Sequence, residues 1–133
     1  MRNIDFNYTT SEIAVASADC TIRIFDIKTL QEKKNFLGHK LSSNIVHFNT
    51  DGKFLLTGGR DGCLNIWEVG NYKIIKSIPA HKWAIYDIAY SPNSNLFATA
   101  SRDKTIKIWD SKTFELLKVI NKVKDGGHLN SIN

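Results

Sequence analysis

Cysteine, proline and long apolar runs are scarce in this sequence. Only two cysteines and two prolines occur among its 133 residues, and neither Cys20 nor Cys63 lies in a Cys-X-X-Cys pair or among clustered histidines. A metal site is therefore not indicated. No segment reaches the roughly 20 apolar residues of a membrane-spanning helix, and polar residues directly follow Met1, where a secretory signal would become apolar. We expect no membrane partner and a cytoplasmic location, or a nuclear one in a eukaryote.

Negative charge is also in short supply. The sequence has 18 Lys and Arg residues against 13 Asp and Glu, which gives a formal net charge of +5. Most of the excess is lysine spread along the whole chain, whereas a nucleic-acid groove more often clusters Arg and Lys with aromatic residues on one element. We interpret the charge as mainly solvated surface. Nucleic-acid binding through lysine-rich outer edges stays open as an alternative, and it would show a steep salt dependence.

What the sequence does contain is a repeat with a step of 42 residues. The recurring positions are Asp19, Asp61 and Asp103; Phe25, Trp67 and Trp109; Asp26, Glu68 and Asp110; His39 and His81. A residue that performs one chemical event is needed once, whereas a residue found in every unit serves something that every unit requires. Repetition therefore indicates architecture before catalysis.

The residue pattern within each repeat unit predicts four short β-strands. Apolar and polar residues alternate with the two-residue period of a strand, most clearly in 105–109, and Asp61-Gly62 is a strong hairpin signal. The expected strands cover 4–8, 13–17, 21–25 and 31–37; 45–49, 54–59, 63–67 and 73–78; 85–90, 96–101, 105–109 and 115–120. Lysine within each fourth strand suits an exposed outer edge. Helical repeats are excluded, and an all-β propeller of about three four-stranded antiparallel blades fits best.

The same residues resemble the WD-repeat β-propeller family, whose unit opens with Gly-His and closes with Trp-Asp. Gly38-His39 and Ala80-His81 open two units here, which close with Trp67-Glu68 and Trp109-Asp110. The first unit closes with Phe25-Asp26, and Gly127-His128 would open a fourth. The resulting division is a WD-repeat fragment over 1–133, with 3–37 as blade one, 38–79 as repeat two, 80–121 as repeat three, and 122–133 as a linker and the start of a fourth repeat.

The resemblance implies a hydrogen-bonded structural tetrad of His, Ser or Thr, Asp and Trp in each complete unit. The two expected tetrads are His39, Thr57, Asp61 and Trp67 in repeat two, and His81, Thr99, Asp103 and Trp109 in repeat three. Ser101 is an alternative hydroxyl on the same strand face as Thr99. In blade one, Val15 and Phe25 replace the hydroxyl and the indole, so we expect that tetrad to be absent or degraded.

His, Asp and a hydroxyl also suggest a Ser-His-Asp hydrolase. Two copies of the set, each fixed to strands and a tight turn, favour the structural interpretation instead. We therefore expect no catalytic residues, no metal and no cofactor, and we expect stability to fall when Asp61 or Asp103 is replaced.

Binding is the better functional class, because a propeller gathers loops on the two faces of a rigid scaffold. The resemblance places four candidate partner-binding residues on the top face: Arg60, Trp83, Tyr86 and Arg102. They favour a protein or peptide partner that is acidic or phosphorylated. The opposing interpretation is that Trp83 and Tyr86 only pack between units. A second alternative is an interaction domain of an enzyme or signalling protein whose catalytic part lies outside this chain.

Three units fall short of the four to eight blades of a closed propeller. We therefore expect that further blades, or a second copy of the chain, complete the ring, and that the chain is a fragment of a longer protein. His128 lies 47 residues after His81 instead of 42, so we expect a longer connection around 123–127.

Overall fold

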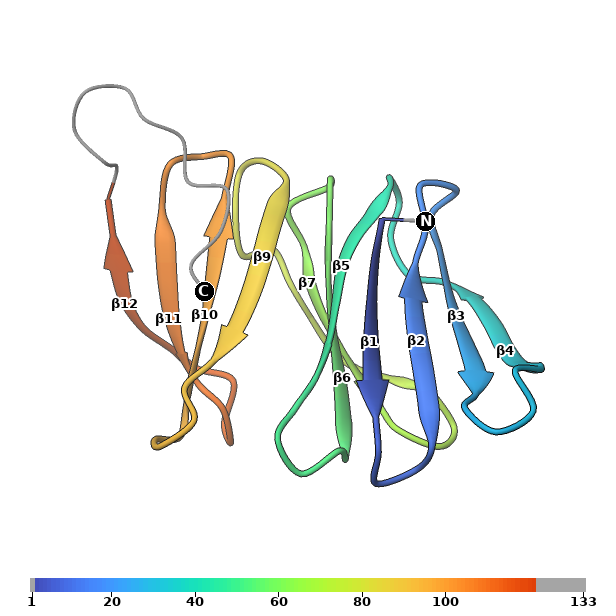
Figure 1. The fold of residues 1–133 in the computed structure, drawn as a ribbon. Coiled ribbons are helices and arrows are strands. Elements are labelled where there is room, and N and C mark those ends of the chain that lie inside the picture. The colour runs from blue at the N-terminus through green and yellow to red at the C-terminus, as the bar shows by residue number, and fades with distance from the viewer. Residues whose placement is uncertain (1, 122–133) are drawn as a thin grey trace.

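The computed structural model describes residues 2–121, which form twelve β-strands and no helix (Figure 1). The first sheet contains β1 (Asn3–Asn7), β2 (Glu12–Ala16), β3 (Thr21–Asp26) and β4 (Glu32–Leu37). The second contains β5 (Ser43–Phe48), β6 (Phe54–Gly59), β7 (Leu64–Glu68) and β8 (Ile74–Ile78). The third contains β9 (Ile85–Tyr90), β10 (Leu96–Ser101), β11 (Ile106–Asp110) and β12 (Leu116–Ile120). The expected linker and the fourth opening at Gly127-His128 lie outside the described residues.

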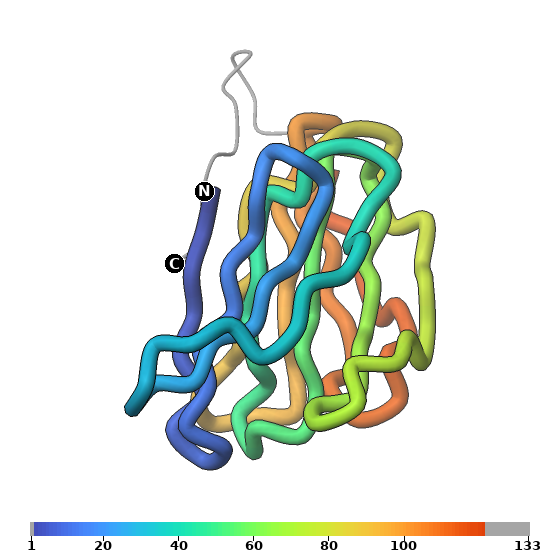
Figure 2. The backbone as a smooth tube through the Cα atoms, turned by 90° about the vertical axis from the view of Figure 1, so that its right-hand side faces the viewer, coloured from blue at the N-terminus to red at the C-terminus, as the bar shows by residue number. Residues whose placement is uncertain are grey.

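Each sheet is an antiparallel meander whose strands pair in chain order. The sheets stand side by side, with β5 against both β1 and β9 (Figures 1 and 2). Pairing between the third and fourth strands shifts register at the same place in every sheet, just before Phe25, Trp67 and Trp109. The described strands do not close into a ring. The prediction of an all-β fold with three four-stranded antiparallel sheets in an incomplete ring is confirmed.

Two apolar cores join the three sheets. The first and second sheets enclose a cluster that includes Ile22 and Ile24 from β3 and Trp67 from β7. The second and third sheets enclose a cluster that includes Ile66 and Phe97. Alternation along the third strands explains this, because successive side chains point to opposite faces of a sheet. In β7, Ile66 points toward the third sheet and Trp67 points toward the first, so both faces of this strand are buried.

The fourth strands form the outer edge, as their lysines predict. Most residues of β4 and β8, and all residues of β12, are exposed. This position leaves their outward hydrogen-bonding edge open to solvent, where Lys33, Lys76 and Lys118 discourage pairing with another sheet.

The three hairpin turns between the second and third strands share one backbone shape. Cys20, Gly62 and Lys104 all have positive φ, at 75°, 78° and 69°. Glycine is therefore not required for the turn to form, although it adopts this shape at the lowest cost. The feature that all three turns share is the Asp before each of these residues, whose carboxylate accepts the backbone N–H two residues later, as in the bond from Cys63 to Asp61 at 3.0 Å.

Candidate functional site: the loop face and the polar networks beneath it

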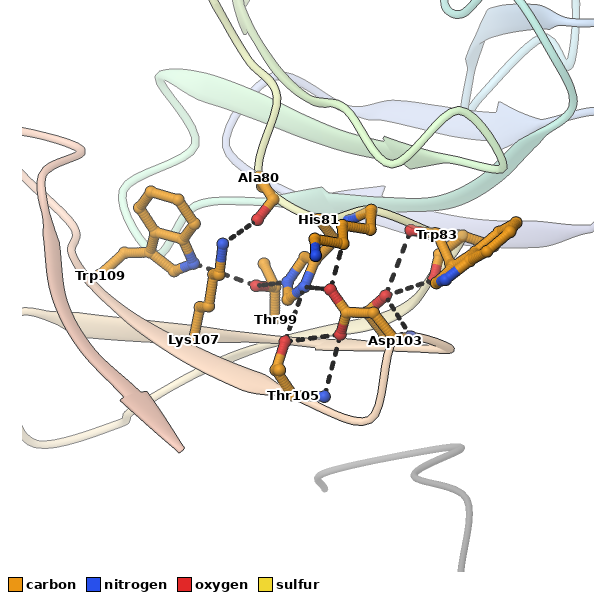
Figure 3. A network of polar contacts seen from close by, with 11 residues as sticks. Ala80, His81, Trp83, Thr99, Asp103, Thr105, Lys107 and Trp109 are labelled. Carbon is orange, nitrogen blue, oxygen red and sulfur yellow. Dashed lines mark hydrogen bonds and ion pairs between the residues drawn. The ribbon is translucent and has the colours of Figure 1, made fainter. Parts of the chain in front are cut away.

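The third sheet carries a continuous polar network below its loops (Figure 3). The indole N–H of Trp109 donates to Thr99 Oγ1 at 3.0 Å, and that hydroxyl lies 2.7 Å from His81 Nε2. On the other side of the ring, His81 Nδ1 lies 2.9 Å from Asp103 Oδ2. The structure therefore brings together the four side chains expected for repeat three.

The second sheet has the matching arrangement. Trp67 donates to Thr57 at 3.0 Å, Thr57 Oγ1 lies 2.8 Å from His39 Nε2, and His39 Nδ1 lies 3.1 Å from Asp61 Oδ1. Both networks join the second and third strands of one sheet to the loop that enters that sheet. They differ in one donor, because Thr105 adds a hydroxyl bond of 2.6 Å to Asp103, where the second sheet has Cys63.

The proton positions follow from the carboxylate at one end of the network. An ionised carboxylate only accepts, so His81 Nδ1 carries the imidazole hydrogen and donates it to Asp103. Nε2 of the neutral ring then accepts the hydroxyl hydrogen of Thr99, whose oxygen accepts the indole N–H of Trp109. Burial lowers the pKa of His81, although the bond to Asp103 acts in the opposite direction. The imidazole is therefore neutral near pH 7, and its contact with Asp103 is a hydrogen bond to an anion.

Both turn carboxylates are held in the ionised form. Burial opposes ionisation of Asp61, yet hydrogen bonds from His39 and from the Cys63 backbone lower its pKa below the usual value. Asp103 has the same opposition between burial and hydrogen bonding, with Thr105 and His81 as the main donors, and its pKa is also lowered.

These geometries argue against nucleophilic chemistry at the networks. Thr57 and Thr99 are 0% exposed, and the side chains of His39 and His81 are fully covered. Each hydroxyl already uses its hydrogen on the imidazole and accepts from an indole. A substrate carbonyl has no route to such an oxygen, so the arrangement resembles a catalytic relay only in its residue types.

The first sheet lacks the network. Val15 and Phe25 stand at the positions of the hydroxyl and the indole. Asp19 is exposed and forms an ion pair with Arg23 at 3.2 Å, and hydrogen bonds from Thr21 contribute most to lowering its pKa to about 2. The turn keeps its Asp while the buried half of the network is missing.

Ser101, the alternative hydroxyl, has a different role. Its Oγ donates to the backbone carbonyl of Ala84 at 2.9 Å and accepts the N–H of Asp103 at 3.0 Å. Together with the bond from the Arg102 N–H to the Ala84 carbonyl at 2.9 Å, it ties the turn of the third sheet to the loop that carries Trp83. These hydrogen bonds therefore hold in place the exposed loop surface around Trp83.

The structure brings two of the four candidate partner-binding residues together on that surface. Trp83 is 60% exposed, and with Arg102 it lines a small pocket of about 130 Å³. Arg60 is also exposed, on the turn whose Gly62 lies against the loop of Trp83. Tyr86 is half-buried on β9. Trp83 is therefore available for contact, whereas Tyr86 is only partly exposed.

One buried polar cluster has no counterpart in the sequence predictions. Glu12, which is 4% exposed, accepts the hydroxyl of Tyr72 at 2.6 Å and pairs with Lys33 Nζ at 2.6 Å. Burial and this hydrogen bond raise the pKa of Tyr72. The cluster joins the first and second sheets across 60 residues of sequence, and the 42-residue step does not repeat it, so periodicity gave no signal.

Metal and membrane sites have no support in the part of the chain that the structure describes. Within 2–121, no three His, Cys, Asp or Glu side chains gather in a way that would hold a metal ion. Over the same residues, the search for a helix long and apolar enough to cross a membrane finds none.

Comparison with known proteins identifies the repeat. The sequence model of the family described as WD40, "WD domain, G-beta repeat", matches residues 2–26, 30–68 and 72–110. The second and third matches each begin before the last strand of one sheet and end with the third strand of the next, so the sequence repeat is offset from the sheet by one strand. A search of curated protein sequences gives no match.

Solved WD40 propellers share the fold. A structure of U3-55K and one of the RRP9 WD40 repeats each superpose with a TM-score of 0.85, at 19% and 20% identity, over 92% of this chain and 39% of theirs. The computationally designed Ika8 protein superposes with a TM-score of 0.79 at 27% identity, over 92% of this chain and 36% of that one. The chain thus spans about two fifths of the length of these solved structures.

Proposed function

This chain belongs to the WD40 family, and we propose that it is a non-catalytic scaffold that binds a protein or peptide on its loop face. WD40 domains are generally protein-interaction scaffolds, and the propellers similar to this chain share that architecture. The observation that carries the proposal is an exposed Trp83 beside Arg102, on loops fixed by buried hydrogen bonds. Tryptophan and arginine are the residues that most often carry contact energy at interfaces.

The charge of this face favours an acidic or phosphorylated partner. Arg60, Lys82 and Arg102 are exposed around Trp83. The carboxylates of the two turns, Asp61 and Asp103, are bonded to histidines and mostly covered, so they do not present free acidic groups to a ligand. An arginine beside an aromatic ring suits a phosphate or carboxylate on a peptide that also has an apolar side chain.

Fluorescence anisotropy with labelled peptides tests the proposal. The probes are an acidic peptide containing phosphoserine, its serine version, and a version with Gln and Asn in place of Glu and Asp. We expect the phosphorylated peptide to bind most tightly, and Trp83→Ala or Arg102→Ala to weaken it by about tenfold or more. Lys82→Ala on the loop face and Lys76→Ala on β8 are a matched pair, and only the first should reduce binding.

Two results would count against the loop face. Equal affinity for all three peptides would exclude a preference of the loop face for an acidic or phosphorylated partner. An effect of Lys76→Ala as large as that of Lys82→Ala would show a diffuse contact of net charge. A labelled single-stranded oligonucleotide tests the nucleic-acid alternative, which requires tight, steeply salt-dependent binding that falls with Lys76→Ala or Lys118→Ala.

A further inference from the structure

Both end sheets have an apolar face that the described residues leave uncovered. On the third sheet, Leu96, Ala98, Ile106, Ile108 and Ile120 line an open depression of about 370 Å³. The residues 42 positions before Ile106 and Ile108 are Leu64 and Ile66, which are 0% exposed against the third sheet. The third sheet thus displays a face that its predecessors bury.

The first sheet displays the complementary face. Ile4 and Phe6 are each 43% exposed, whereas Val46 and Phe48, their equivalents in the second sheet, are 1% and 5% exposed. Leu30 is 68% exposed, and its equivalents Tyr72 and Phe114 are buried at 5% and 8%. This is the face that the second and third sheets turn toward their predecessors.

Leu30 is oriented like its buried equivalents. Leu30, Tyr72 and Phe114 all have left-handed φ angles, at 59°, 52° and 61°. In each case the backbone N–H bonds to the carbonyl four residues earlier, at 2.8 to 2.9 Å. The same turn therefore projects a side chain from the same corner of every sheet, and within residues 2–121 only the first sheet lacks a neighbour to receive it.

The receiving residue is chemically matched at both interfaces within the chain. Tyr72 meets Glu12 through a hydrogen bond of 2.6 Å, and Phe114 meets Phe54 edge to face at 5.8 Å. One step further along the repeat, the receiving position is Leu96 and the projecting position is Leu30. A polar side chain thus faces a polar one at the first interface, and an aromatic side chain faces an aromatic one at the second. The two open faces of the chain present the third pair, which is leucine with leucine.

We propose that a second copy of this chain docks head to tail, with the third sheet of each copy against the first sheet of the other, and Leu96 of one against Leu30 of the other. A second pair of positions is compatible with this contact. The ring centroids of Phe36 in the first sheet and Trp67 in the second lie 4.7 Å apart. The equivalent of Phe36 in the third sheet is Ile120, the equivalent of Trp67 in the first sheet is Phe25, and both are apolar.

A head-to-tail contact leaves one open face on each copy unless it closes on itself. Two copies supply two such contacts and six sheets, a number within the range of closed propellers. The second copy thus covers all four apolar end faces of the pair by repeating the interface already present between neighbouring sheets.

Light scattering after size exclusion tests the proposal on the 133-residue chain across a wide range of concentration. The expected mass is twice the 15.1 kDa of one chain. Leu30→Glu and Leu96→Lys should each weaken association by about 30-fold or more. Both changes in one chain should restore the pair, because each contact then joins opposite charges. Leu41→Glu changes another leucine, 49% exposed in the loop between β4 and β5 and outside both faces, and it should leave the mass unchanged.

Circular dichroism on every variant separates loss of the pair from loss of the fold. Recovery by the double variant supports the proposal even if a single variant folds poorly. A single-chain mass at all concentrations overturns the proposal and leaves further WD40 blades as the occupants of the two faces. A ladder of ever larger masses, or an effect of Leu41→Glu equal to that of Leu30→Glu, overturns closure by two copies.

Discussion

Replacing Thr99 with valine isolates the hydrogen bonds of one network from its packing. Valine has nearly the shape of threonine, but it neither accepts from the Trp109 indole, 3.0 Å away, nor donates to His81 Nε2, 2.7 Å away. Thr99 is 0% exposed, so water cannot take over either bond. An unsatisfied buried polar group costs about 1–3 kcal/mol. With two such groups and partial relaxation, we expect Thr99→Val to lower the free energy of unfolding by about 3 kcal/mol.

The repeat provides the control for this experiment. Val15 occupies the same position in the first sheet, where the network is absent, so Val15→Thr should change stability by less than about 0.5 kcal/mol. Thr57→Val in the second sheet should repeat the loss. The measurement is equilibrium unfolding in urea, in which these changes shift the midpoint without changing the slope.

A double-mutant cycle then tests whether the bonds cause the loss. In a chain that already carries Trp109→Phe, Thr99→Val should cost less, because one of its two stranded partners is gone. The reasoning is refuted if Thr99→Val is as mild as Val15→Thr, or if its cost is the same with and without Trp109→Phe. Either result would mean that the site is held by packing alone.

Three further outcomes follow from the same geometry. The pKa values of His81, Asp61 and Asp103 are lowered on folding, so the unfolded chain takes up more protons than the folded chain as the pH falls. Urea midpoints measured at several pH values should therefore drop below a pH of about 6.5, where the stability contributed by neutral His81 is lost. They should drop again below a pH of about 3.9, where the stability contributed by the two carboxylates is lost. Asp103→Ala should lower the melting temperature, and loss of peptide binding at an unchanged melting temperature would contradict its structural role. Lys104→Gly should raise stability by about 0.5–1 kcal/mol by relieving a φ of 69°, whereas Gly62→Lys should lower it, because a Cβ at Gly62 would lie 2.2 Å from the His81 carbonyl oxygen.

The sequence predicted those features that every unit must repeat. Alternation located each strand to within about two residues, and the 42-residue step brought Asp103 and His81 together because both positions belong to the same local module. Thr99 was favoured over Ser101 by resemblance alone. The geometry separates them, since Ser101 bonds to backbone carbonyls of the neighbouring loop.

Features that differ from one interface to the next could not be predicted from the sequence. Glu12 and Tyr72 are 60 residues apart, and neither residue type recurs at its repeat positions, so the period could not connect them. The positive φ of the turn at Leu30 could not be predicted for a different reason. Sequence reasoning assigns positive φ to glycine and asparagine, whereas the bond to the Asp26 carbonyl at 2.8 Å holds a leucine in that shape.

This contrast indicates how the chain divides its interactions. The networks under the loops are nearly identical in the second and third sheets, because each one stabilises a single sheet and must not depend on its neighbour. The pairs between sheets are all different: Glu12 with Tyr72, and Phe54 with Phe114. A pair that is mismatched buries a carboxylate against a ring or strands a hydroxyl, at a cost of about 1–3 kcal/mol. Nearly identical networks therefore stabilise the second and third sheets individually, and unlike pairs determine which sheet faces which.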